Sequence, residues 1–122
     1  MIDTTSISQK IDHTHLSLNT DIVNIKQLCE EALQYNFHSV CIYSNWINIV
    51  KNLLEDSSIQ ICTVVGFPSG NDSTLSKLNE MQKSINEGAT EIDMVMNIKL
   101  FKEKKYQFVL DEIKKMVECS KG

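Results

Sequence analysis

The stretch that decides the fold is residues 59–97, which read IQICTVVGFPSGNDSTLSKLNEMQKSINEGATEIDMVMN. A β-branched run at 59–65 predicts a buried strand, and apolar side chains at helical spacing predict a helix over 74–87. Gly88 follows as the expected C-terminal cap, and residues 91–97 predict a second strand. A strand, a helix and a strand in this order are typical of a parallel βαβ unit.

The same alternation of strand and helix extends toward both ends of the chain. Two earlier strands are expected at 6–14 and 39–43, and three further helices at 20–35, 44–54 and 106–119. Thr20 and Ser44 are the expected N-caps of the two earlier helices. The order βαβαβαβα predicts an α/β fold with parallel strands and outer helices, in a single domain over residues 1–122. The pattern alone leaves two closures open, a small open sheet or half of a (βα)8 barrel.

Composition excludes several classes of function. The formal net charge is −4, and all twelve basic residues are lysines. A phosphate backbone requires a basic face, so we expect no nucleic-acid partner. No apolar run approaches the roughly 18–20 residues of a membrane span, and residues 1–10 do not read as a signal peptide. We therefore expect a cytoplasmic protein without a membrane partner.

Carboxylates near the carboxyl ends of the predicted strands are the first candidates for chemistry. Asp93 has apolar neighbours, and an ionised carboxylate in a strand expected to be buried on both faces is costly unless it is paired or functional. It is either a proton-relay group or a carboxylate bonded to backbone or lysine. Asp12 is either a site carboxylate or a turn residue; spacing favours the turn, with an ion pair to Lys10 on the same face.

Histidine and cysteine spacing predicts no metal site. His13 and His15 have the spacing of a ligand pair, yet no matching third ligand is obvious in the sequence. The four cysteines form no C-x-x-C pair, so we expect small buried thiols in a reducing compartment. The GFPSG segment at 66–70 offers backbone N–H groups to an anion, although a single glycine-rich turn is weak evidence.

Four segments carry a family resemblance: IDHTHL at 11–16, SVCIY at 39–43, CTVVGFPSG at 62–70 and GATEIDMVMNI at 88–98. In this order and spacing they resemble the deoxyribose-phosphate aldolases. Those enzymes cleave 2-deoxyribose 5-phosphate to glyceraldehyde 3-phosphate and acetaldehyde through a lysine Schiff base. The resemblance implies a (βα)8 barrel, of which this chain is the N-terminal half, and it implies no metal or organic cofactor.

The resemblance also implies roles for four residues. Asp93 matches a carboxylate that relays protons at the reacting carbon together with a lysine, and Asp12 matches a carboxylate that holds the proton network. Thr14 matches a hydroxyl beside them. Cys41 matches a cysteine that lines the substrate pocket and is no nucleophile of the normal cycle. Catalysis is therefore expected from the two carboxylates, and substrate binding from Thr14 and Cys41.

One departure from the family pattern bears on activity. Eight βα units need roughly 200 residues or more, and the family's Schiff-base lysine, in a KTSTG-type motif, lies beyond the segments matched here. Its partner lysine and the phosphate-binding glycines also lie beyond them. Retro-aldol cleavage needs the imine as electron sink, so we expect a chain truncated before that lysine to be inactive alone. Lys10, near a strand start, and Lys99, on an expected exposed loop, are poor substitutes.

Half of a barrel is expected to leave two strand edges unpaired. We therefore expect a homo-oligomer or pairing with a C-terminal half-barrel, with a small phosphosugar as substrate once the site is completed. The alternative is a non-catalytic module, derived from the aldolase half-barrel, that binds a small molecule or assembles with a partner. A third hypothesis is a structural or regulatory subunit of a true aldolase.

Overall fold

The computed structural model describes residues 3–121, in which four parallel strands form one sheet in the order β1-β2-β3-β4. The strands are β1 (Asp12–Thr14), β2 (Ser39–Ile42), β3 (Gln60–Val65) and β4 (Glu91–Met94). The helical elements are α1 (Thr4–Ser8), α2 (Ile22–Tyr35), the 3-10 turn η1 (Ser44–Trp46), α3 (Ile47–Leu53), α4 (Thr74–Glu87), α5 (Ile98–Lys102) and α6 (Tyr106–Ser120).

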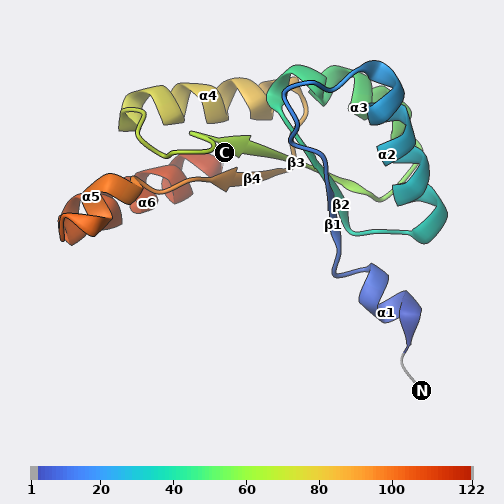
Figure 1. Cartoon of the computed structure of the whole chain (residues 1–122), viewed down its shortest axis with the longest axis horizontal. Helices are drawn as coiled ribbons and strands as arrows, with labels where there is room; N and C mark the ends of the chain where they lie inside the picture. The colour runs from blue at the N-terminus through green and yellow to red at the C-terminus, as the bar shows by residue number, and fades with distance from the viewer. Residues whose placement is uncertain (1–2, 122) are drawn as a thin grey trace.

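The strand order distinguishes between the two closures that the sequence leaves open. Each strand pairs with the next one along the chain. Crossovers between parallel strands are right-handed, so a sheet that always grows in one direction carries its crossover helices on one face. A doubly wound sheet reverses direction and is covered on both faces. Figure 1 shows α2, α3 and α4 along one side of the sheet. The arrangement is therefore half of a (βα)8 barrel with its helices outside.

Side chains of each strand alternate between the helix-covered convex face and the concave face of the sheet. The convex positions join the main core, where Val40, Ile42 and Ile61 pack with Ile25 of α2 and Val50 of α3. The concave positions form a separate small cluster of Cys41, Cys62 and Val64, with Leu16 and Tyr43 packed against it. The two faces of one sheet thus have different chemistry.

The prediction of the first strand is wrong over most of its length. Residues 6–14 were expected to be extended, but the chain forms helix α1, a turn and then the three-residue strand β1. The Asp3 carboxylate accepts a hydrogen bond from the Ser6 N–H at 3.3 Å, which is the contact of an N-terminal cap. A local cap therefore outweighs the alternating pattern in this segment.

The caps of the two earlier helices also differ from the prediction. Asp21, not Thr20, caps α2, because its carboxylate accepts from the Asn24 N–H at 3.0 Å. The Thr20 hydroxyl instead donates to the Ser17 carbonyl at 2.6 Å. Ser44 begins the turn η1 and caps no helix, and α3 starts only at Ile47. Short side chains compete for such positions, and the outcome depends on backbone conformation.

Strand β4 ends three residues before its predicted end. Met94 is its last residue, and Asn97 caps a helix, α5, that the sequence pattern did not predict. The Asn97 side chain accepts from the Leu100 N–H at 3.0 Å. Lys99 therefore lies on an exposed helix instead of a loop. Gly88, in contrast, ends α4 as predicted, with φ at 127°. None of the helices described between residues 3 and 121 is long and apolar enough to cross a membrane.

Candidate active site

Three adjacent strands bring two thiols and a carboxylate together on the concave face. Cys41 of β2 and Cys62 of β3 are register partners. Asp93 lies on β4, beside β3. The two sulfur atoms and a carboxylate oxygen of Asp93 all lie within 4.8 Å of one another. Both cysteines are nearly fully buried, at 3% and 1% exposure, whereas Asp93 is exposed at the rim of the group.

The remaining predicted residues surround this group. Thr14 of β1 is the register partner of Cys41, its hydroxyl donates to the Asp12 carbonyl at 3.0 Å, and it contributes to lowering the pKa of the Cys41 thiol. The carboxylates of Asp12 and Asp93 both act electrostatically on Cys41. The structure therefore brings Asp12, Thr14, Cys41 and Asp93 to one patch, from strands that are far apart in sequence.

The pKa values of the two thiols are shifted in opposite directions. A hydrogen bond from Cys62 lowers the pKa of Cys41, against the opposing effects of burial and of the two nearby carboxylates. The same hydrogen bond raises the pKa of Cys62, and burial and the negative charge of Asp93 raise it further. The hydrogen bond between the two thiols therefore favours the ionised form of Cys41 and the protonated form of Cys62.

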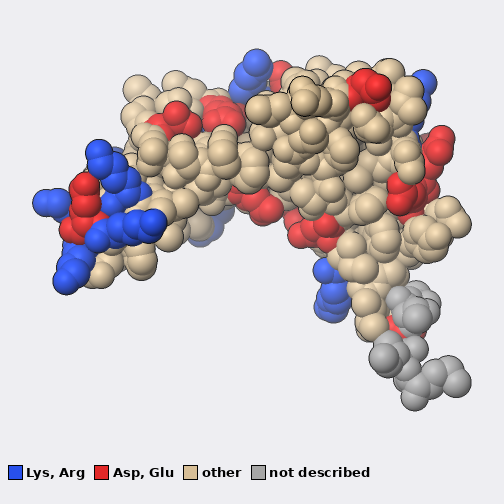
Figure 2. Space-filling view, in the orientation of Figure 1, with Lys and Arg blue, Asp and Glu red and all other residues tan. Residues whose placement is uncertain are grey.

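A second polar group lies beside Asp12 on the same face. The Ser39 hydroxyl donates to the Asp12 carboxylate at 2.7 Å, and His38 forms a hydrogen bond with Glu91. Oxygen or nitrogen atoms of Asp12, His38 and Glu91 lie within 4.8 Å of one another. Figure 2 shows acidic side chains on the hollow underside of the molecule, between the α1 end and the α5–α6 end. The concave face is thus acidic and offers two groups of potential metal ligands.

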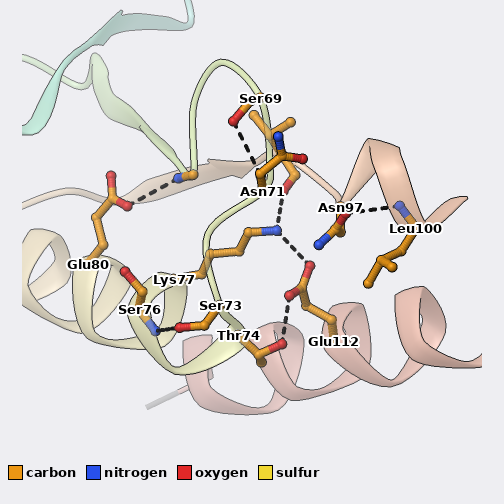
Figure 3. A network of polar contacts seen from close by, with 12 residues as sticks. Ser69, Asn71, Ser73, Thr74, Ser76, Lys77, Glu80, Asn97, Leu100 and Glu112 are labelled. Carbon is orange, nitrogen blue, oxygen red and sulfur yellow. Dashed lines mark hydrogen bonds and ion pairs between the residues drawn. The ribbon is translucent and has the colours of Figure 1, made fainter.

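A buried ion pair joins α4 and α6 and holds the segment that follows β4 (Figure 3). The Lys77 ammonium donates to the Glu112 carboxylate at 2.7 Å and to the Val95 carbonyl at 2.8 Å. The Thr74 hydroxyl donates to the other oxygen of Glu112 at 2.7 Å. Both charged side chains are at most 1% exposed. The pair therefore links α4 and α6 to the segment that directly follows β4, close to Asp93.

The loop after β3 is held by its own contacts. The Gly66 N–H donates to Glu80 at 3.1 Å, and the Gly70 N–H donates to the Gly66 carbonyl at 2.7 Å. Gly70 has φ at 73°, and a Cβ there would lie 1.9 Å from the Met96 carbonyl oxygen. Two of the N–H groups expected to hold an anion are therefore already used within the protein.

Two expectations for single residues are wrong, the burial of Asp93 and the ion pair of Asp12 with Lys10. Asp93 was expected in a strand buried on both faces, but it is exposed, because within residues 3–121 the helices lie along the convex face of the sheet. Asp12 begins β1 and accepts from Ser39; within residues 3–121 it forms no ion pair with Lys10. His13 lies 3.5 Å from Glu31, and neither it nor His15 belongs to a potential metal-ligand group of the described residues.

Three further residues of the site region were not predicted as functional. Cys62 was expected only as a buried thiol. Its strand, β3, lies next to the strand of Cys41 and two strands from that of Asp12, and this placement could have identified it as part of the site. Lys77 lies on the buried stripe of α4 with Met81 and Ser84, and Glu112 lies on that of α6. A charged residue at core spacing in each of two helices is the pattern that reveals such a pair.

Comparison with known proteins identifies the family. The family model of the DeoC/LacD family aldolases matches residues 2–121. The chain belongs to the DeoC/LacD aldolase family. It is 43% identical to the deoxyribose-phosphate aldolase of Carboxydothermus hydrogenoformans over all of its own length and 54% of that protein. It is 46% identical to that of Finegoldia magna over 95% of this chain and 54% of the relative. The chain therefore spans about half the length of the curated relatives it matches.

Solved structures of this aldolase family agree with the fold. A putative deoxyribose-phosphate aldolase from Coccidioides immitis superposes with a TM-score of 0.93 at 35% identity, over 98% of this chain and 47% of that one. The aldolase of Aeropyrum pernix, described as having a unique tetrameric structure, superposes with a TM-score of 0.80 at 28% identity, over 97% and 50%. The four strands and their helices thus correspond to half of each aldolase.

Because the family resemblance implies a lysine Schiff base, the location of the described lysines bears on the expected chemistry. Among the described residues, Lys77 is the lysine that is fully buried, and its ammonium is bound to Glu112 and Val95. Lys10 and Lys99 are exposed, and within residues 3–121 no lysine forms an ion pair with Asp93. Within residues 3–121, therefore, the carboxylate of Asp93 has no lysine ammonium within ion-pair distance.

Proposed function

We propose that this chain provides the acid–base wall of a deoxyribose-phosphate aldolase site. The observation that carries the proposal is the convergence of Asp12, Thr14, Cys41 and Asp93 on one concave patch, in a chain of the aldolase family. The supported reaction is cleavage of 2-deoxyribose 5-phosphate to glyceraldehyde 3-phosphate and acetaldehyde, the reaction that the family resemblance implies.

In this proposal each side chain has a distinct task. Asp93, exposed at the rim, exchanges a proton with the reacting carbon through its carboxylate. The Asp12 carboxylate is the second carboxylate of the site, and the hydrogen bond from the Ser39 hydroxyl fixes its orientation. Thr14 and Cys41 line the wall and contact the substrate. The electron sink of the cleavage is a lysine imine, and its amine comes from outside the described residues.

The proposal extends to partners. The edges of β1 and β4 carry no neighbouring strand within residues 3–121, and unpaired edges favour association. We propose that the concave face is completed either by a second copy of this chain or by a chain that carries the other half of the barrel. The phosphosugar binds only in the completed barrel.

Reductive trapping tests the proposed function. The chain is incubated with acetaldehyde, reduced with borohydride and analysed by mass spectrometry. The same is done with a chimera in which this chain replaces the matched part of the Carboxydothermus hydrogenoformans aldolase. We expect no lysine adduct on the chain alone, and in the chimera an adduct in the part contributed by the relative, together with cleavage of deoxyribose 5-phosphate.

Two results would contradict the proposal. One is a lysine adduct on the isolated chain, which would place the imine-forming amine within these 122 residues. The other is a folded chimera, with the circular dichroism of the relative, that forms the adduct but does not cleave the phosphosugar. Substrate stabilisation without turnover in that chimera would instead support the non-catalytic binding module.

A further inference from the structure

The buried side chain of Lys77 lies between the loop that follows β3 and the segment that follows β4 (Figure 3). Its aliphatic part lies against Gly66, where an added Cβ would be 2.9 Å from the Lys77 Cε. Its ammonium donates to the Val95 carbonyl at 2.8 Å. One side chain therefore contacts the chain just beyond the carboxyl ends of two strands, where parallel βα folds place their chemistry.

The hydrogen bond to Val95 extends the order of the sheet beyond its last paired residues. β3 ends at Val65, whose carbonyl still accepts from the Val95 N–H at 2.9 Å. Gly66, with φ at 67°, then turns the chain out of the ladder. The Val95 carbonyl accepts from the ammonium of Lys77. Lys77 thus fixes the path of the chain two residues after Asp93.

We propose that Lys77 is a positioning residue of the aldolase site, because its hold on the Val95 carbonyl sets the position of the Asp93 carboxylate. This inference rests on the proposed function, in which Asp93 exchanges a proton with the reacting carbon. A group that transfers a proton must lie within hydrogen-bond reach of its target, and a misplacement of about 1 Å can lower a rate by about 10²-fold. Lys77 itself does not reach the substrate, because its ammonium is fully buried and bound to Glu112 and Val95.

The ion pair of Lys77 is explained by geometry better than by stability. A buried ion pair is often no more stable than an apolar pair of similar volume, because burial removes the hydration of both charges. An apolar side chain, however, cannot donate to the Val95 carbonyl. The Glu112 carboxylate, which accepts from the Thr74 hydroxyl at 2.7 Å, holds the donor in place. It also balances the charge of Lys77, so the effect on Asp93 is one of position and not of electric field.

A variant that keeps the fold but lacks the donor tests the proposal. In the chimera with the Carboxydothermus hydrogenoformans aldolase, Lys77→Met/Glu112→Leu removes both buried charges together. Lys83→Met makes the same lysine substitution at an exposed position of α4. We expect the double variant to lower kcat for deoxyribose 5-phosphate cleavage by about 10–100-fold, with KM changed by less than about threefold. Lys83→Met is expected to keep kcat within about twofold.

The loss of kcat is expected to vanish once Asp93 is absent. If Lys77 acts through Asp93, adding Lys77→Met/Glu112→Leu to Asp93→Asn lowers kcat by no more than about twofold. General damage to the barrel would instead lower kcat again by the full factor. Such additivity, or a folded double variant that turns over at the unsubstituted rate, would overturn the proposal.

Amide hydrogen exchange gives a measurement that needs no turnover. In the isolated chain, the Val95 N–H is expected to exchange about tenfold faster or more in Lys77→Met/Glu112→Leu than in the wild type, while α2 keeps its rates. Unchanged exchange at Val95, or an equal rise in α2, would overturn the proposal. An unsubstituted chimera without cleavage would contradict the proposed function, and exchange at Val95 would still decide whether Lys77 holds this segment.

Discussion

Lys77 and Glu112 show how much a single buried charge depends on its partner. Neither side chain is more than 1% exposed, and the two form a direct ion pair. Lys77→Met is expected to destabilise the fold by about 3–5 kcal/mol, because it leaves the Glu112 charge buried without its cation. Urea unfolding followed by circular dichroism measures the change.

Two variants control this prediction. Lys83→Met removes a lysine whose side chain is 77% exposed and whose ammonium lies 3.9 Å from Glu87, so a change of about 0–1 kcal/mol is expected. The double variant Lys77→Met/Glu112→Leu is expected to recover much of the loss, since no unpaired charge remains. A single variant Lys77→Met as stable as the wild type would contradict the assignment.

The thiol of Cys29 is expected to make the stability of the fold depend on pH. Burial, with a smaller contribution from Glu30, raises the pKa of this thiol from 9.0 to about 11. The unfolded chain therefore ionises first as pH rises, so stability that is complete below pH 9 is lost between about pH 9 and 11. Comparison with Cys29→Ala in urea under reducing conditions isolates this contribution to stability, about 2–3 kcal/mol. Parallel pH curves for the two proteins would refute it.

Much of the candidate site follows from the family resemblance of four short segments, but its geometry does not. Asp12, Thr14, Cys41 and Asp93 were identified from sequence, and they do converge; their catalytic roles stay predictions. The exposure of Asp93 was missed, because spacing does not reveal which face of a sheet is covered. The proximity of Cys62 to Asp93 required the strand register, which no local pattern supplies.

Helix caps are the element-scale feature that the structure revises most clearly. Asp21 and Asn24 form a reciprocal capping box at the start of α2, with hydrogen bonds of 3.0 and 3.3 Å. Asp21→Ala is expected to cost about 0.5–2 kcal/mol, and Asp21→Ser, which keeps an acceptor, clearly less. Thermal unfolding measures both. A larger loss of thermal stability in Thr20→Ala than in Asp21→Ala would show that Thr20 is the cap, as the sequence predicts.

Gly70 is the loop position with least tolerance for a side chain. Its φ is positive, a conformation that is strained for alanine. In addition, an alanine Cβ would lie 1.9 Å from the Met96 carbonyl oxygen, so the backbone would have to shift. Gly70→Ala is expected to cost more than about 1 kcal/mol, and roughly 2–4 kcal/mol if the loop has to open. Ser69→Ala, at the exposed neighbouring position, serves as the control for urea unfolding. Equal midpoints for the two variants would contradict this account.

Long periodic elements were predictable and short ones were not. The helices α2, α4 and α6 span 14 or 15 residues each, and their apolar stripes predicted them to within about two residues. Strand β1 has three residues and helices α1 and α5 have five each. Such segments contain too few residues to establish a period, so single caps such as Asp3 and Asn97 decide their structure.

At the scale of the whole molecule, the accessible surface is larger than that of an average folded monomer of this mass. The accessible surface is 7863 Å² for 13.9 kDa, against about 6,700 Å² for an average folded monomer of that mass. We expect the chain to self-associate at tens of micromolar, which light scattering after gel filtration measures. The account predicts a mass of at least twice 13.9 kDa. A single monomeric species across the concentration range would argue against association through the concave face.

The central claim is that Asp93 supplies the proton-handling carboxylate of the completed site. The most direct measurement is kcat for deoxyribose 5-phosphate cleavage by the chimera with the Carboxydothermus hydrogenoformans aldolase. Asp93→Asn is expected to lower kcat by about 10²–10⁴-fold with little change in KM. Asp111→Asn, on the outer helix α6, is expected to leave kcat unchanged. An Asp93→Asn chimera that turns over at the unsubstituted rate would contradict the claim.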